Sequence, residues 1–121
     1  MKLSIIQSGS TPVYRQIYDE IAAQILSGVI AGGTPLPPIR TVAKELGVSV
    51  ITVRGAWDAL EADGLIITRA GSGCYAADLS RDELENMRLK TLDKPLRELI
   101  NSAKQLGITV EELTDIVEKS Y

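Results

Sequence analysis

The residues whose side chains are best suited to bind a ligand are four cations, which lie among glycines and hydroxyl groups between positions 36 and 75. They are Arg40, Lys44, Arg54 and Arg69. A guanidinium can grip two acceptors on the edge of guanine at once, which makes Arg54 the best candidate for reading a base. The four cations are expected to share one side of the protein, where they would also meet phosphate oxygens. This combination predicts a surface that binds nucleic acid.

Catalysis and metal binding are disfavoured by the composition. The chain contains no histidine and one cysteine. The commonest general base is therefore missing, an internal disulfide is excluded, and a structural zinc site lacks its usual ligands. The sequence predicts neither an enzyme nor a bound metal or cofactor.

Two short helices would position three of the four cations. Apolar residues recur at a spacing of three and four over positions 39–46 and 53–60, which predicts one buried face on each helix. Gly47 can end the first helix, and Ser49 can cap the second. Two such helices joined by a short turn form a helix-turn-helix, whose second helix enters the DNA major groove. The outward side of that helix carries Val50, Ile51, Thr52 and Arg54.

A β-hairpin is predicted directly after these helices. Residues 65–68 and 74–76 favour strands, and residues 70–73 form the tip between them. Gly71, Ser72 and Gly73 allow the backbone to approach a phosphate or the minor groove closely, although a bare turn would also need glycine. A hairpin in this position forms the wing of a winged helix-turn-helix.

The order of these residues resembles the N-terminal domain of the GntR family of bacterial transcription regulators. The match covers about residues 11 to 77 and is carried by Pro12, Tyr14, Gln16, Ile17, Gly28, Gly33, Leu36, Pro37, Arg40, Val48, Ser49, Thr52, Val53, Leu60, Gly64, Gly71, Ser72 and Gly73. The short helical tail resembles the YtrA subfamily. The resemblance implies that the partner is double-stranded DNA, that Arg40 contacts a phosphate or base edge, and that the wing tip contacts DNA.

The recognition helix departs from the family pattern at two positions. Many members carry arginine in place of Val50 and threonine in place of Ile51, so operator sequences of relatives do not transfer to this chain. The two side chains could meet thymine methyl groups or help to bury the turn, and we favour the first role for Ile51 and the second for Val50. The predicted DNA-binding residues are Arg40, Lys44, Ser49, Ile51, Thr52, Arg54, Arg69, Gly71, Ser72 and Gly73.

The excess of acidic over basic side chains lies in the C-terminal third of the chain. Residues 1–77 hold six basic and six acidic side chains, whereas residues 78–121 hold seven and ten, which together give the net charge of −3. The basic surface of the first part is therefore modest. We expect that two copies are needed for useful DNA affinity at physiological salt.

The first helix is predicted over residues 12–27, with Thr11 as its cap, Pro12 at its first position and Gly28 as its stop. Tyr14 and Tyr18 are expected to pack in the core.

The tail from residue 78 onward is predicted to be helical. Pro95 either kinks one long helix or opens a second, and Thr109 with Glu112 forms a capping box before the last helix. Two or three helices in ~44 residues cannot enclose a sizeable core, so their apolar stripes must be buried against something. The most economical partner is the same tail of a second copy, which gives a two-fold dimer. The predicted dimerisation residues are Leu84, Met87, Leu96, Leu99, Ile100, Ala103, Leu106, Leu113, Ile116 and Val117.

The expected fold class is α+β and mainly helical, with a winged helix-turn-helix over residues 1–77 and a short all-α dimerisation and effector-response tail over residues 78–121. No apolar run approaches the ~20 residues of a membrane span, so a cytoplasmic protein without membrane association is expected.

The favoured function is a homodimeric transcription regulator. It would be a repressor that binds an inverted repeat, possible targets being ABC transporter genes by resemblance to YtrA-like regulators. The alternative is a winged interaction module that has lost DNA reading. A small-molecule effector would bind at the dimer interface or between tail and wing domain.

Overall fold

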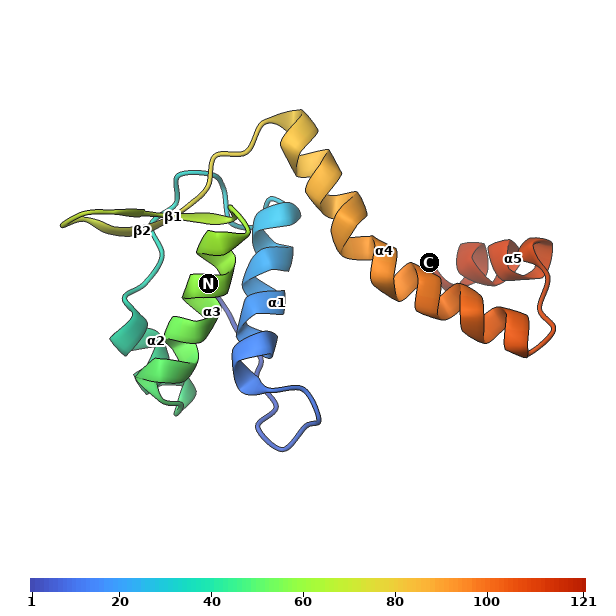
Figure 1. Ribbon diagram of the computed structural model, residues 1–121, viewed down its shortest axis with the longest axis horizontal. Coiled ribbons are helices and arrows are strands. Elements are labelled where there is room, and N and C mark those ends of the chain that lie inside the picture. The colour runs from blue at the N-terminus through green and yellow to red at the C-terminus, as the bar shows by residue number, and fades with distance from the viewer. The chain divides into compact units, whose positions relative to one another are not determined.

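The computed structural model describes residues 1–121 and divides them into two compact units, Met1–Ser80 and Arg81–Tyr121. The first unit contains helices α1 to α3 and a two-stranded sheet, and the second contains α4 and α5 (Figure 1). The predicted class, α+β and mainly helical, is confirmed. The boundary between the two units lies after Ser80, three residues later in the chain than the predicted boundary at residue 77.

Helix α1 spans Val13–Leu26 and supplies the centre of the core through Ile17, Ile21 and Ile25. Its predicted start was wrong in detail. Pro12 is the N-cap and lies outside the helix, with φ −53° and ψ 145°, and no side chain caps the helix. The carbonyl of Thr11 instead accepts a 2.9 Å hydrogen bond from the side chain of Gln16, which fixes the approach to α1.

The N-terminal arm, residues 1–7, lies in an extended form along α1. Three side chains spaced four residues apart on α1 bond to the backbone of alternate arm residues. Gln24 donates to the carbonyl of Lys2, Glu20 accepts from the amide of Ser4, and Gln16 makes one bond each way with Ile6, all at 2.7 Å. The rise of four helical residues nearly matches that of two extended residues, so the ladder keeps its register.

Replacement of Gln16 by alanine is expected to loosen this arm. Gln16 makes three hydrogen bonds, two with Ile6 and one with Thr11. Their loss should lower the free energy of unfolding by about 1–2 kcal/mol, since single hydrogen bonds contribute about 1 kcal/mol and are not additive. Urea unfolding and hydrogen exchange at the amide of Ile6 measure the effect. Gln24→Ala, which removes one bond, is the matched control, and an equal loss in both variants would contradict the ladder.

Helices α2 (Ile39–Leu46) and α3 (Val50–Ala62) form the predicted helix-turn-helix. Gly47 ends α2 with φ 68°, a left-handed conformation that suits glycine. The amides of Gly47 and Val48 turn back to the carbonyls of Lys44 and Ala43 at 3.3 and 3.0 Å. Ser49 then caps α3 as predicted, because its Oγ accepts from the amide of Thr52 at 3.1 Å.

The buried face of α3 packs against α1 and α2. Its fully or almost fully buried members are Val53, Ala56, Trp57 and Leu60. Trp57 is 3% exposed, which confirms that it belongs to the core. The opposite face of α3 is thereby left to solvent.

The wing consists of β1 (Ile66–Arg69) and β2 (Gly73–Ala76), which pair antiparallel with Ile67 opposite Tyr75. Each strand extends one residue closer to the tip than predicted. Because alternate residues point to opposite faces, Ile66 and Ala76 enter the core, while Arg69 and Tyr75 lie on the other face. The hydroxyl of Thr68 donates to the carboxylate of Glu61 and so joins the wing to α3.

The connector between α1 and α2 runs beside β2 and fixes the point where the chain leaves the wing. The amide of Leu36 donates to the carbonyl of Cys74 at 2.9 Å, and that of Gly33 to Ala76 at 2.8 Å. A Cβ atom on Gly32 would lie 2.9 Å from Cα of Asp78 and 3.2 Å from the carbonyl oxygen of Ala77. Glycine at position 32 therefore permits this close approach of two backbones.

The two tyrosines of α1 lie nearer the surface than predicted. Tyr14 is 45% exposed, so the expectation that it belongs to the core was wrong. Tyr18 is half-buried, and its hydroxyl donates to the carboxylate of Asp63 at the end of α3. Arg15 lies over the Tyr18 ring, with its Cζ 4.6 Å from the ring centre.

Burial of Tyr18, together with the hydrogen bond and negative charge of Asp63, raises the pKa of Tyr18 to about 12. A tyrosine in the unfolded chain ionises near pH 10, so the unfolded state releases its proton first as pH rises. The contribution of Tyr18 to stability should be complete below pH 10 and lost between about pH 10 and 12. The free energy of unfolding, measured with urea at several alkaline pH values, should therefore decline less with rising pH in Tyr18→Phe than in the wild type. Parallel declines would contradict the assignment.

The second unit consists of α4 (Arg81–Gln105) and α5 (Val110–Ser120), joined by a turn at Gly107. Pro95 lies inside α4, so of the two predicted arrangements the structure has one long helix. The capping box of Thr109 and Glu112 is confirmed in both directions, at 3.1 and 3.2 Å. No helix of the chain is long and apolar enough to cross a membrane.

Candidate nucleic-acid interface

The start of α3 is well ordered by its own side chains. Ser49 accepts from the amide of Thr52, and the two hydroxyl groups also lie 2.8 Å apart in a hydrogen bond. The cap holds both side chains at the exposed N-terminal end of the helix. Each hydroxyl keeps capacity for one further partner, so both remain able to contact a phosphate or base.

Ile51 projects from this end of α3 and is 82% exposed. It therefore does not help to bury the turn, which removes one of the two roles considered for it. Val50 is half-buried and fits the packing role. Arg54, one helical turn after Val50, is exposed. The outward face at the start of α3 thus presents an apolar group and a guanidinium side by side with two hydroxyls.

The start of α2 leaves backbone donors open. Pro38 is the N-cap and no side chain caps the helix, so the first amides of α2 have no partner within it. Arg40 is the second residue of the helix and is exposed. Amides and a guanidinium together at a helix N-terminus favour an anion such as phosphate.

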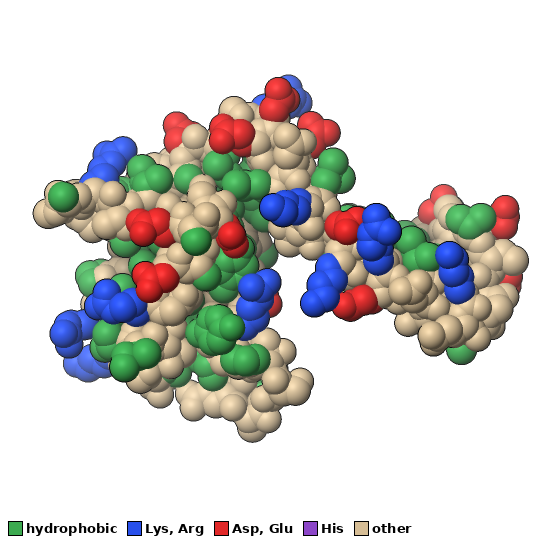
Figure 2. All heavy atoms as spheres, in the orientation of Figure 1, with side chains coloured by type: hydrophobic (Ala, Val, Ile, Leu, Met, Phe, Trp, Pro, Cys, Tyr) green, Lys and Arg blue, Asp and Glu red, His purple; other side chains and the backbone are tan.

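The four predicted DNA-binding cations are free of ion pairs. Ion pairs join Arg15 to Asp19, Arg97 to Asp93 and Lys119 to Asp115. Arg40, Lys44, Arg54 and Arg69 are all exposed, and none of them belongs to such a pair. In Figure 2, Lys and Arg side chains gather over α2 and the beginning of α3, and another lies over the wing. Unpaired cations keep their full attraction for phosphate.

The wing tip is held together by Tyr75. The Cζ atom of Arg69 lies 5.0 Å from the centre of the Tyr75 ring, and the Tyr75 hydroxyl bonds to the Ser72 hydroxyl. Gly71 and Gly73 have φ values of 73° and 110°, so the tip requires glycine at both positions. Tyr75 was not among the predicted contact residues. The hairpin register was the available signal, because it places residues 69 and 75 on one face.

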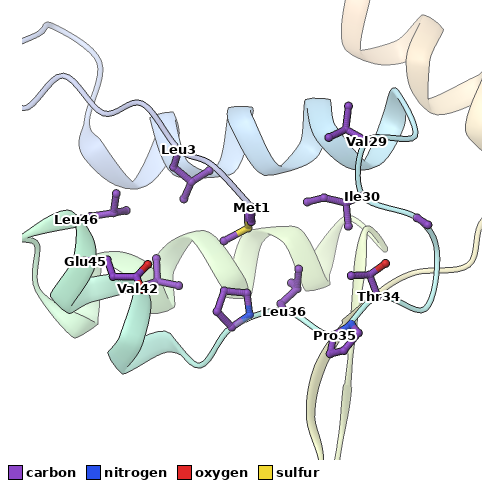
Figure 3. Close-up of a pocket in the computed structure, with 12 residues that line it drawn as sticks. Met1, Leu3, Val29, Ile30, Thr34, Pro35, Leu36, Val42, Glu45 and Leu46 are labelled. Carbon is purple, nitrogen blue, oxygen red and sulfur yellow. The ribbon is translucent and has the colours of Figure 1, made fainter.

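A groove of about 860 Å³ opens on another side of α2 (Figure 3). Met1 and Leu3 of the arm line it, as do Ile30 and Leu36 of the connector and Val42 of α2. Glu45 is its one charged side chain. None of the ten residues predicted to contact DNA lines the groove, so it is separate from the cationic surface.

Most residues predicted for dimerisation are accessible in the second unit. Leu96, Leu99, Leu106, Ile116 and Val117 are between 45% and 75% exposed, whereas Ala103 is 5% exposed. Leu84, Met87, Ile100 and Leu113 are half-buried. Leu96, Leu99 and Ile100 follow one another at helical spacing and present an apolar stripe on α4.

Comparison with known proteins identifies the family of this chain. Residues 13–76 match the family described as bacterial regulatory proteins, gntR family. The chain belongs to the GntR family. The HTH-type transcriptional repressor YtrA of Bacillus subtilis is 28% identical over 117 residues, which cover 97% of this chain and 90% of YtrA. That likeness supports membership of the YtrA-like subfamily, with its short helical tail.

Solved structures of two further proteins are similar to most or part of the chain. A GntR family transcriptional regulator from Listeria monocytogenes has a TM-score of 0.83 at 28% identity, over 93% of this chain and 97% of that one. The DNA-binding domain of AraR, solved in complex with operator ORX1, has a TM-score of 0.57 at 28% identity, over 64% of this chain and 99% of that one.

Some relatives are much longer. The probable rhizopine catabolism regulatory protein MocR of Rhizobium meliloti is 41% identical over 80 residues, 66% of this chain but only 16% of that protein. The matched family, YtrA and the Listeria protein are transcription regulators.

Proposed function

We propose that this GntR protein is a homodimeric transcription repressor that binds an inverted-repeat operator. The observation that carries the proposal is the set of unpaired, exposed cations on α2, at the start of α3 and on the wing, together with the uncapped N-terminus of α2. The likeness to the DNA-binding domain of AraR, which was solved in complex with an operator, supports DNA binding by this unit. Repression is proposed from the likeness to the repressor YtrA.

Each contact residue has a proposed role. Arg54 reads a guanine edge, and the exposed methyl groups of Ile51 meet a thymine methyl. Arg40 and Lys44 hold phosphates on one side, and Arg69 with the wing backbone of Gly71, Ser72 and Gly73 holds the other. Ser49 and Thr52 contact the backbone at the start of α3. Ile51 is 82% exposed, so its methyl groups are accessible for that contact.

The tail is proposed to join two copies. Its leucines on α4 are about half exposed in one chain, and burying an apolar stripe against the same stripe of a second copy forms a closed two-fold interface. A single head with four cations binds DNA weakly at physiological salt, whereas two linked heads gain from the effective concentration of the second. The two-fold axis of the protein would then match an inverted repeat.

The YtrA resemblance further suggests control of ABC transporter genes and release from DNA by a small effector. The effector would act at the dimer interface.

Selection of sites from a random DNA pool with the full-length protein, followed by affinity measurements across a salt series, tests the proposal. An enriched inverted repeat with a steep loss of affinity as salt rises is expected, because each phosphate contact releases counterions. The selected pattern would then locate target promoters, including those of transporter genes. If no sequence is enriched, with or without cell extract metabolites, the chain would instead be a winged interaction module.

A further inference from the structure

The wing carries a cation that is stacked but otherwise unengaged. Arg69 ends β1 and is exposed, and its guanidinium lies over the ring of Tyr75 at 5.0 Å. No carboxylate pairs with it. Directly opposite Arg69 in the hairpin is Gly73, which has no side chain to separate the guanidinium from the diagonal ring. The face-on contact leaves the N–H donors at the edges of the guanidinium open.

Tyr75 is itself fixed from both sides. Its hydroxyl bonds to the hydroxyl of Ser72 at the wing tip, and its strand position lies between Ile67 of β1 and Pro35 of the connector. The ring is therefore a rigid platform tied to the tip and to the body of the first unit. An arginine otherwise loses considerable rotamer freedom when it grips a phosphate.

We propose that Tyr75 is a positioning residue that holds Arg69 ready for its DNA contact. The ring acts through Arg69 and does not itself touch DNA. This inference rests on the proposed function, because it presumes that Arg69 binds a phosphate or the minor groove. The hydrogen bond between the Tyr75 and Ser72 hydroxyls sets the position of the ring relative to the wing tip. The guanidinium on that ring and the wing backbone would therefore contact the DNA together.

A double-mutant cycle on the full-length protein, measured with the selected operator, tests the inference. Tyr75→Leu should weaken binding about two- to fivefold, the range expected for an exposed cation–π contact. Tyr75→Phe, which keeps the ring but loses the hydroxyl bond to Ser72, should lose less affinity than Tyr75→Leu. In the Arg69→Ala background, Tyr75→Leu should cause no further loss. The salt dependence of Tyr75→Leu should also shift toward that of Arg69→Ala, which a purely structural defect would not produce.

The outcomes separate this inference from the function on which it rests. Absence of operator binding by the wild type would overturn the proposed function. Operator binding that Arg69→Ala weakens but Tyr75→Leu does not would overturn the positioning role alone. An equal loss from Tyr75→Leu with and without Arg69 would also overturn it, because Tyr75 would then act by supporting the hairpin. Thermal unfolding of each variant shows whether the wing remains folded.

Discussion

Replacement of Leu99 by aspartate is expected to produce a monomer that binds the operator about 100-fold or more weakly than the wild type. Leu99 is 47% exposed in the single chain, so an aspartate there costs the monomer little. In the proposed dimer the same position would bury two carboxylates without partners, which is strongly unfavourable. Loss of the linked second head removes the gain from effective concentration, which reaches about 100-fold or more.

Sedimentation and operator titration measure the two effects together. Asn101→Asp is the matched control, since it places the same charge on the same helix but on the side away from Leu96, Leu99 and Ile100. It should remain dimeric with unchanged affinity. A wild-type protein that is monomeric at micromolar concentration, or a monomeric Leu99→Asp variant with full affinity, would contradict the dimer.

Arg54→Ala should lower operator affinity by about 1–3 kcal/mol, or about 5- to 150-fold, and relax base preference at one position in each half-site. The reason is that a guanidinium gripping a guanine edge contributes sequence information as well as affinity. Lys44→Ala should instead weaken all sequences about equally and reduce the salt slope by about 1. Binding to a panel of single-base operator variants distinguishes these patterns.

An arginine that already has a partner provides the control for Arg54. Arg15 pairs with Asp19 at 3.2 Å and lies over Tyr18. Arg15→Ala should therefore leave both affinity and base preference unchanged. The base-reading role of Arg54 is wrong if its variant and Lys44→Ala behave alike across the panel.

The parts of the fold that were predicted correctly depend on nearby residues. Gly47 ends one helix, and Ser49 and Thr109 cap two others, through bonds that span about five residues or fewer. Their chemistry can therefore be inferred from a short stretch. The exposure of Ile51 follows in the same way from its place on a helix whose opposite face is apolar.

The arm and the start of α1 required knowledge of distant contacts. Residues 3–6 offered only a short apolar run, whereas their place is set by side chains of α1 that lie 10 to 22 positions later. Thr11 is not the cap because Pro12, with φ −53° and ψ 145°, takes the N-cap position, and Gln16 bonds to the carbonyl of Thr11. Tyr75 was missed for a related reason. Its contact with Arg69 depends on the hairpin register, which a one-residue shift would have reversed.

The close approach of Gly32 to Asp78 limits the length of unanchored chain between the two units. Ala77 is bonded to Leu65 at 2.9 Å, and α4 begins at Arg81, so only Leu79 and Ser80 lie between the anchored chain and the helix. Two residues span at most about 7 Å, and one added base pair moves a half-site about 3.4 Å along the DNA and turns it by about 35°. In the proposed dimer, a tether this short would therefore restrict the range of half-site spacings that both DNA-binding units can occupy at once.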